Sequence, residues 1–201
     1  AVLASPSRDA IDWGALHVWW GDERFLPTGH ADRNETQARE ALLDHVPLDP
    51  AHVHPMPSSD GGLDVDVAAA QYADELRRHS RPEDHAALPS FDVCLLGIGP
   101  DAHVASLFPQ APALHETERT VVGVHSSPKP PPVRVSLTLP ALQASTEIWI
   151  IADGRGKADA LRRALSGAGP VQVPAAGARG RERTLVIIDE DAAGALPPEI
   201  R

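Results

Sequence analysis

The residues best suited to acid–base chemistry follow an apolar run at positions 91–98. That run leads into Gly97-Ile-Gly99-Pro, and Asp101 and His103 come directly after it. An imidazole exchanges protons near neutral pH, and a neighbouring carboxylate can fix its tautomer. Open α/β sheets bind ligands at the carboxyl ends of their strands, which is where these residues fall. The pattern therefore predicts His103 as a general base that Asp101 orients.

The local structure around His103 is also predictable. We expect His103 at the start of a helix, where the partial charges of the amides disfavour imidazolium. We expect Gly97 and Gly99 to let the backbone turn sharply and approach a ligand. In the alternative interpretation, Asp101 only caps the helix and His103 is a loop histidine without a catalytic role.

A second strand-like run, Leu16–Trp20, also ends in glycine and charge. Gly21 is followed by Asp22, Glu23 and Arg24. The planar guanidinium of Arg24 can bind a carboxylate or a phosphate. Alternatively, Arg24 forms a surface ion pair with Asp22 or Glu23, which contributes little to stability. Two charged strand ends in one sheet favour a shared site over two separate ones.

A weaker candidate for a phosphate site is the segment Asp153-Gly154-Arg155-Gly156-Lys157-Ala158, between a strand and a helix. Glycine-rich backbone and a lysine at a helix start suit an anion. The segment is not a Walker loop, because the spacing and the Lys-Ser/Thr pair are absent.

Metal and covalent chemistry are not expected. His52 and His54 alternate and could form a His-x-His ligand pair, but no carboxylate or third histidine is tied to them by motif spacing. We therefore expect exposed edge histidines and no metal site. Cys94 lies in an apolar run and is expected as a buried small hydrophobic residue. No Gly-x-Ser-x-Gly turn is present, so Ser106 is not expected to act as a nucleophile.

These residues need a framework of alternating strands and helices. The strand-like runs are Leu16–Trp20, Phe91–Ile98, Thr120–Val124, Glu147–Ala152 and Thr184–Ile188. The helical patterns are Asn34–Val46, Asp64–His79 and Gly156–Ser166. A further run over 133–139 alternates apolar and polar residues, which predicts a strand with one polar face. The pattern predicts one α/β domain over residues 1–201, with an open, mostly parallel sheet and helices on both faces.

The amino-acid composition limits the classes of partner that the chain is expected to bind. The 201 residues include 18 Lys and Arg and 28 Asp and Glu, for a formal charge of −10. This balance disfavours nucleic acids and anionic membranes as partners, although a local field can still attract an anionic small molecule. No apolar run is long enough to span a bilayer, and no basic segment followed by an apolar one opens the chain. We expect a cytoplasmic protein, monomeric or weakly self-associating, with a small-molecule partner.

Four segments together resemble the 6-phosphogluconolactonase family of the glucosamine/galactosamine-6-phosphate isomerase superfamily. They are Gly97–Pro109, Asp22–Arg24, the Gly154, Lys157 and Ala158 element, and Arg134–Thr138. The resemblance covers almost the whole chain in the expected order. It implies a Rossmann-like, NagB-type fold.

The resemblance implies hydrolysis of 6-phospho-D-glucono-1,5-lactone to 6-phosphogluconate by water that His103 activates, with Asp101 holding the imidazole. Arg24, or backbone amides near Gly99, would offset charge on the oxyanion. The residues expected to bind substrate are Asp22, Gly97, Gly99, Arg134, Lys157 and Arg179. Lys157 is the first candidate for the phosphate, and no metal or organic cofactor is required.

Two departures from the family pattern carry expectations. Family members usually begin with a strand and a Ser-Gly-Gly-Ser-Thr-Pro loop, which have no counterpart before Ala1. We therefore expect the amino-terminal strand and loop to be missing and the phosphate site to be incomplete. Ala102 stands where the motif has glycine, which costs on the order of 1 kcal/mol if the backbone there has positive φ.

Two alternative functions stay open. A sugar-phosphate-binding regulatory module could use the same fold without turnover, although the chain lacks a helix-turn-helix motif and a basic face. A glucosamine-6-phosphate deaminase-like isomerase would need a glutamate where this chain has Phe108, which cannot transfer protons.

Overall fold

The computed structural model of the chain describes residues 6–84 and 87–199. The strands are β1 (Val18–Trp19), β2 (Asp22–Arg24), β3 (Val53–His54), β4 (Val93–Gly97), β5 (Val121–Val124), β6 (Arg134–Leu137), β7 (Glu147–Ala152) and β8 (Arg183–Ile188). The α-helices are α1 (Asn34–Ala41), α2 (Val65–His79), α3 (Leu139–Gln143), α4 (Ala158–Leu165) and α5 (Pro174–Gly177). Short 3-10 helices are η2 (Pro6–Ala10), η3 (Trp13–Ala15), η4 (Leu43–His45), η5 (Pro50–His52), η6 (Ser59–Gly61), η7 (Pro112–His115), η8 (Arg155–Lys157) and η9 (Ala192–Ala195). Across these described residues, no helix combines the length and the apolar character needed to cross a bilayer.

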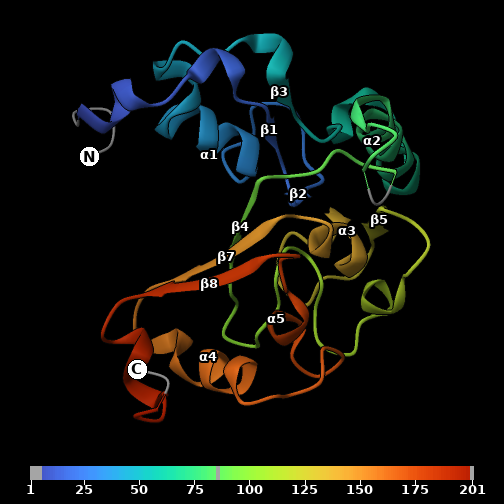
Figure 1. Cartoon of the computed structure of the whole chain (residues 1–201). Coiled ribbons are helices and arrows are strands. Elements are labelled where there is room, and N and C mark those ends of the chain that lie inside the picture. Colours follow the sequence, from blue (N-terminus) through green and yellow to red (C-terminus); the bar gives the residue numbers. More distant parts are fainter. Residues whose placement is uncertain (1–5, 85–86, 200–201) are drawn as a thin grey trace.

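β4, β7 and β8 form a parallel sheet with β7 in the centre, and Gly97 lies opposite Ile151. Figure 1 shows α4 and α5 together on one side of this sheet. On that side, side chains such as Leu96 and Ile150 are buried. Side chains of the opposite face are open to solvent, with exposed fractions of 62% for Leu95 and 45% for Ile151. An apolar row therefore lines the uncovered face.

The second sheet is antiparallel, in the order β2-β6-β5, and α2 packs against β5 and β6. The residues Asp22–Arg24, expected to follow a strand, form a strand of their own, in which Arg24 lies opposite Arg134. The predicted polar face of β6 exists, but Arg134 and Ser136 on it are buried. This face is therefore part of the interior and does not meet water.

The third sheet joins β1 and β3 in parallel, with Trp19 opposite His54. The buried hydroxyl of Tyr72 on α2 accepts a hydrogen bond from the Trp20 amide at 3.0 Å. The same oxygen lies 3.3 Å from the carbonyl oxygens of Trp20 and His54. One side chain thus ties α2 to both strands. The predicted α/β class is confirmed, with its strands divided over these three sheets.

Two predicted helices differ from the structure. The helix expected over 34–46 ends at Ala41, because Leu42 has φ −150° and ψ −54°, and it continues only as η4. The helix expected after His103 does not form. Ala102 and Ala105 have φ of +71° and +48°, which lie in the left-handed region and interrupt any right-handed helix.

Candidate active site

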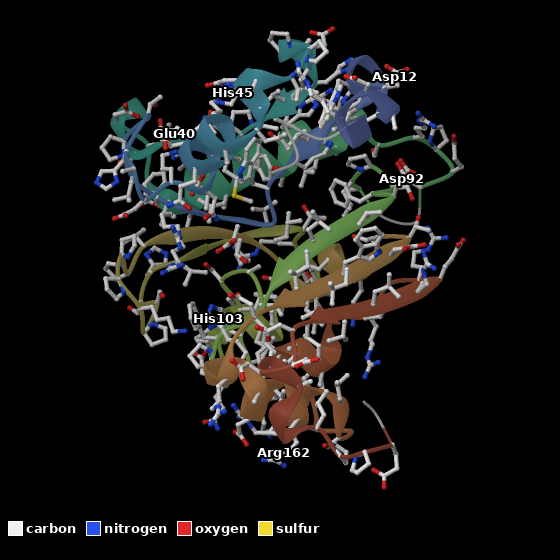
Figure 2. All side chains as sticks on the ribbon, turned by 90° about the vertical axis from the view of Figure 1, so that its left-hand side faces the viewer. Asp12, Glu40, His45, Asp92, His103 and Arg162 are labelled. Atoms are coloured by element: carbon white, nitrogen blue, oxygen red, sulfur yellow. The ribbon has the colours of Figure 1, made fainter. Side chains whose placement is uncertain are left out.

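His103 and Asp101 lie in the loop that follows β4. The amide of Gly99 donates to the carbonyl of His103 at 2.9 Å, and the amide of Ala102 donates to the carbonyl of Gly99 at 2.8 Å. Figure 2 shows His103 beyond the carboxyl end of β4, whereas Asp92 lies at the other end of that strand. Backbone hydrogen bonds within the loop therefore position the candidate base at the sheet edge predicted from the sequence.

The two side chains are in direct contact. Nδ1 of His103 lies 2.6 Å from Oδ1 of Asp101. A carboxylate only accepts hydrogen bonds, so Nδ1 carries the proton and Nε2 presents its lone pair. The His103 side chain is 17% exposed, which leaves a path for water to the ring. The pair thus has the tautomer that a general base needs.

The environment keeps His103 neutral. Burial is the largest influence and lowers the pKa of His103 below its ordinary 6.5, and the charge of Lys129 lowers it further. Asp101 and, more weakly, Asp22 act in the opposite direction. The predicted neutral imidazole thus follows from burial, whereas the predicted contribution of a helix start is wrong, since no helix begins there.

Asp101 stays ionised beside this ring. Burial raises the pKa of Asp101, but the hydrogen bond and charge of His103 and the charge of Lys129 outweigh it, so the pKa lies below 3.8. Asp101 is therefore an anion that can stabilise an imidazolium.

Lys129 is the site residue that the sequence did not point to. Its Nζ donates to Oδ1 of Asp101 at 3.3 Å and lies 3.4 Å from Nδ1 of His103. It belongs to a proline-rich loop, and the buried Arg134 holds that loop by donating from Nε and Nη2 to the carbonyls of residues 129–131. The Arg134 guanidinium also lies 5.8 Å from the centre of the Phe108 ring, which in turn packs 4.5 Å from the His103 ring.

Gly97 and Gly99, the two glycines of the motif, have different surroundings. A Cβ on Gly99 would overlap the His103 ring and lie 2.5 Å from Oδ1 of Asp101, so this position requires glycine for close approach. A Cβ on Gly97 would meet nothing within 4 Å. Ala102, where the family has glycine, is fully buried with φ +71°, so the strained alternative applies.

Asp22 connects the second motif to this loop. Its Oδ2 accepts a hydrogen bond from the hydroxyl of Ser106 at 2.7 Å, and Asn34 donates to its backbone carbonyl at 2.9 Å. Ser106 is buried, and its amide donates to the hydroxyl of Ser136 on β6. The two predicted motifs thus meet, and Ser106 holds them together.

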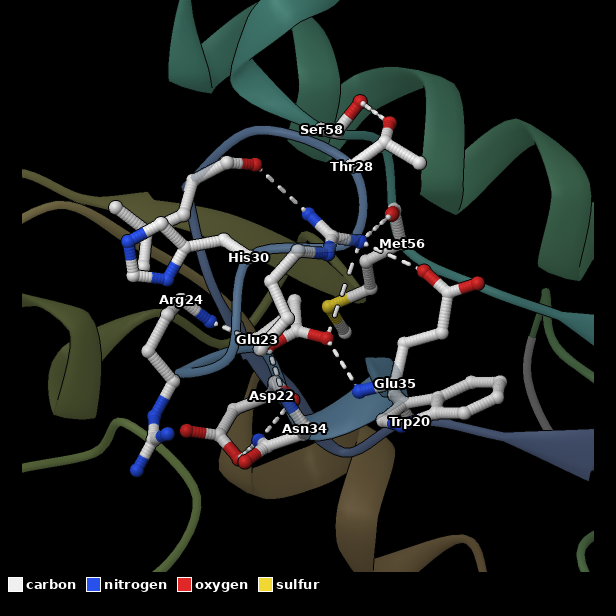
Figure 3. Close-up of polar contacts among 12 residues, drawn as sticks. Trp20, Asp22, Glu23, Arg24, Thr28, His30, Asn34, Glu35, Met56 and Ser58 are labelled. Carbon is white, nitrogen blue, oxygen red and sulfur yellow. Dashed lines mark hydrogen bonds and ion pairs between the residues drawn. The ribbon is translucent and has the colours of Figure 1, made fainter. Parts of the chain in front are cut away.

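Glu23 is a buried carboxylate, so the predicted alternative of a surface ion pair is wrong for this residue. Its oxygens accept from the amides of Asn34 and Glu35 at 2.7 and 2.9 Å and thereby cap the start of α1 (Figure 3). The buried guanidinium of Arg33 lies 3.8 Å away. Burial raises the pKa of Glu23, although these amides and Arg33 oppose the rise.

The guanidinium of Arg24 is held by a residue that lies outside the active site. Its Nη1 donates to the carbonyl of Asp32 at 2.5 Å, and its buried Nε has no hydrogen-bond partner among the described residues. On the neighbouring strand, burial lowers the pKa of Arg134. The charge of Asp22 acts to raise this pKa, and the charge of Arg24 lowers it further. Arg24 therefore contributes positive charge to the same region as Asp22 and Arg134.

Lys157 and Arg179 are the remaining cations that the sequence predicts to bind substrate, and their surroundings differ. Nζ of Lys157 donates to the carbonyl of Ile98 at 2.6 Å, which brings it to the same strand end as His103. Arg179 is exposed, donates to the carbonyl of Ala176, and precedes Gly180, which contacts the first residues of β7. Arg179 also lines a small hollow that includes Ile98, and its role in substrate binding stays a prediction.

The assembled site combines a neutral base, an anion that orients it and several cations. Such a group can activate water and stabilise negative charge on a carbonyl oxygen. Among the described residues, the set with metal-ligand spacing is His54, Glu75 and His79, which lies on β3 and α2 and apart from His103.

Comparison with known proteins identifies the family of the chain. The chain is 64% identical over 199 residues to a 6-phosphogluconolactonase of Streptomyces coelicolor, covering 98% of this chain and 76% of the relative. It is 52% identical over 195 residues to a 6-phosphogluconolactonase of Mycobacterium tuberculosis, covering 96% and 78%. The crystal structure of 6-phosphogluconolactonase from Thermotoga maritima superposes with a TM-score of 0.76 at 29% identity, covering 89% of this chain and 74% of that one. A family profile described as glucosamine-6-phosphate isomerases/6-phosphogluconolactonase matches residues 1–187. The chain belongs to this family.

Proposed function

We propose that the chain hydrolyses 6-phospho-D-glucono-1,5-lactone to 6-phosphogluconate, the reaction named for its relatives in Streptomyces and Mycobacterium. The observation that carries the proposal is the 2.6 Å contact between His103 and Asp101 at the carboxyl end of β4. It leaves Nε2 of a neutral imidazole as a proton acceptor. The substrate is an ester, and its hydrolysis needs only water and a group that moves protons.

In the proposed mechanism, Nε2 of His103 takes a proton from water, and the hydroxide attacks the lactone carbonyl. Asp101 stabilises the imidazolium that forms and does not itself take up the proton. When the bond from the carbonyl carbon to the ring oxygen breaks, the imidazolium returns its proton to that oxygen. This transfer restores neutral His103 and leaves a hydroxyl and a carboxylic acid, and the acid then loses its proton to solvent to give 6-phosphogluconate.

The developing oxyanion needs positive charge. The amide of Gly99 is already bonded to His103 within the loop, so we assign this role to Arg24, whose positive charge lies in the same region as Asp22 and Arg134. Lys129 adds a second positive charge beside the imidazole. Preorganised charge of this kind is worth several kcal/mol in a transition state, about 3–4 for a single hydrogen-bond donor.

For substrate binding we propose that Lys157 holds the phosphate, because its ammonium sits at the same strand end and uses one of its three protons on Ile98. Asp22 would face the sugar hydroxyls. Gly97, with open space before it, would let the sugar approach the strand end. Arg134 supports the site indirectly, through the loop that carries Lys129.

The test compares the parent with His103→Asn and with the exposed control His115→Asn. Lactone hydrolysis is followed as proton release and corrected for spontaneous hydrolysis. We expect His103→Asn to lower kcat by roughly 10²- to 10⁴-fold and the control to match the parent. Equal rates for His103→Asn and the parent would overturn the proposal. Binding without acceleration by the parent would instead indicate a sugar-phosphate sensor.

A deaminase-like isomerisation is disfavoured by Phe108. Its hydrocarbon ring packs 4.5 Å from the ring of His103, at the position where the deaminases resembled by this motif carry a proton-transferring glutamate. We further propose that the reaction serves the oxidative pentose phosphate pathway in the cytoplasm, and that the protein is a monomer or a weak homo-oligomer.

A further inference from the structure

A cluster of histidines lies apart from His103, between β1, β3 and α2. These elements lie together in the upper part of Figure 1, across β4 from α4 and α5. The rings of His17 and His52 stack at 3.9 Å, and those of His54 and His79 meet edge to face at 4.6 Å. Glu75 on α2 completes the group. The expectation of exposed edge histidines is wrong for His54, which is 5% exposed.

Three of these side chains are already at metal-ligand spacing. Oε1 of Glu75 lies 3.1 Å from Nδ1 of His54 and 3.5 Å from Nδ1 of His79. One donor atom from each of the three residues lies within 4.8 Å of the others. Ligands placed tetrahedrally around Zn²⁺ at its usual bond lengths are separated by about 3.3 Å. Glu75 and His79 are also one helical turn apart on α2, so they face the same way.

The surroundings orient the buried ligand. The indole of Trp19 stacks on the His54 ring at 3.8 Å with an angle of 8° between the planes. Nε2 of His54 lies 3.0 Å from Nδ1 of His17. Metal-bound histidines commonly use their second nitrogen in such a hydrogen bond, which fixes the ring for the metal. His17 and Trp19 therefore hold Nδ1 of His54 toward Glu75.

Glu75 has one oxygen available for an ion. Arg78 pairs with Oε2 and leaves Oε1 to the histidines. Nδ1 of His54 donates to this oxygen in the metal-free protein, because a carboxylate only accepts hydrogen bonds. An ion that replaces this hydrogen bond displaces its proton, as metal binding to histidine requires.

An ion can reach this cluster from solvent. The side chains of Glu75 and His79 are 27% and 36% exposed. A surface hollow of about 500 Å³ adjoins the cluster, and His54, Glu75 and Arg78 are among its lining residues. This opening leaves room for water as a fourth ligand.

We propose that His54, Glu75 and His79 bind one divalent first-row transition ion such as Zn²⁺, with water as the fourth ligand. The ion would link α2 to β3. Two nitrogen donors and one carboxylate suit Zn²⁺ better than Mg²⁺ or Ca²⁺, which prefer all-oxygen sites. The lactone hydrolysis does not need this ion, so the site and the proposed reaction can fail independently.

The test uses untagged protein in the His103→Asn background, so that the active-site imidazole does not contribute. Zn²⁺ binding is measured by titration calorimetry for that protein and after adding His79→Gln, Glu75→Gln or the control His115→Gln. We expect one ion per chain, at least about tenfold weaker binding for the two ligand variants, and parental binding for the control. Circular dichroism shows whether each variant is folded, and His79 is exposed enough for its replacement to leave the fold intact.

A second readout locates the ion. Cu²⁺ quenches a nearby indole, and Trp19 stacks directly on His54. We expect Cu²⁺ to quench part of the tryptophan emission, and Trp19→Phe or His79→Gln to remove that part. Absence of stoichiometric Zn²⁺ binding, or equal affinity in His79→Gln and its parent, would overturn the proposal.

Discussion

Nδ1 of His103 lies 2.6 Å from Oδ1 of Asp101, and Lys129 lies against the same two atoms. The imidazole therefore has an anion that would stabilise its charged form and a cation that opposes it. Burial adds to the cation's effect, and the pKa of His103 lies below 6.5. The balance of these groups determines how the enzyme responds to pH.

The first prediction concerns that response. The base must be neutral, so kcat/KM falls as pH drops through the pKa of His103 in the free enzyme. Because this pKa is lowered, we expect a plateau through neutral pH and a midpoint below 6.5. Initial rates measured between about pH 5 and 8 check this. A midpoint above 6.5 would contradict it.

Replacing Lys129 with Met should move this midpoint upward. The charge of Lys129 lowers the pKa of His103, so its removal raises that pKa and begins the loss of activity at higher pH. Lys129→Arg keeps the charge and serves as the matched control. An unchanged midpoint in Lys129→Met, with the control also unchanged, would show that the ammonium does not influence the ring.

Gly99→Ala should inactivate the enzyme without unfolding it. The added Cβ would overlap the His103 ring, which must rotate away from Asp101. We expect kcat to fall by about 10² or more, since a small misplacement of a catalytic group has this cost. Gly97→Ala, whose Cβ meets open space, should keep kcat and change KM at most. Steady-state kinetics of both variants test this prediction, and equal kcat values for the two would refute the steric argument.

Replacing Ala102 with glycine measures the free-energy cost of the positive φ at this position. Replacing a buried alanine in a helix, such as Ala164, with glycine should destabilise by about 1.5 kcal/mol, from lost helix propensity and a lost methyl group. Ala102 lies in a loop, so glycine there loses only the methyl group, about 0.8 kcal/mol, and the relief of positive-φ strain, about 1 kcal/mol, offsets that loss. Chemical denaturation should therefore show almost no change for Ala102→Gly. A loss as large as that of Ala164→Gly would mean that the site is unstrained.

Glu23→Gln should weaken the attachment of α1. The amide group would turn a donor toward the Asn34 or Glu35 amide, which are donors themselves. We expect a loss of about 1–3 kcal/mol in the free energy of unfolding, the usual cost of an unsatisfied buried group. Glu40→Gln on the exposed side of α1 should change stability by less than about 0.5 kcal/mol. Equal stabilities of the two variants would contradict the capping role.

Short-range features of the site could be predicted from sequence. Asp101 and His103 are two positions apart, so their contact needs only a loop at the end of β4. The failed prediction of a helix after His103 has a local cause, because alanine gives no sign of the positive φ that residues 102 and 105 adopt.

Long-range features could not be predicted. Lys129 reaches Asp101 across 28 positions, from a loop whose prolines indicate only irregular structure. Charged residues usually face water, so Glu23 offered no sign that it caps a helix eleven positions later. One signal was present for the histidine cluster: Glu75 and His79 have the spacing of ligands on one helix face, but only the fold brings His54 to them.

Arg134 influences the reaction through the loop that carries Lys129. Its guanidinium fastens three successive carbonyls, those of residues 129–131, from a buried position on β6. The backbone that bears the Lys129 ammonium is thus immobilised before any sugar arrives. Little conformational entropy remains to be lost when substrate binds, and the dipoles around the imidazole need not reorganise as charge moves during turnover.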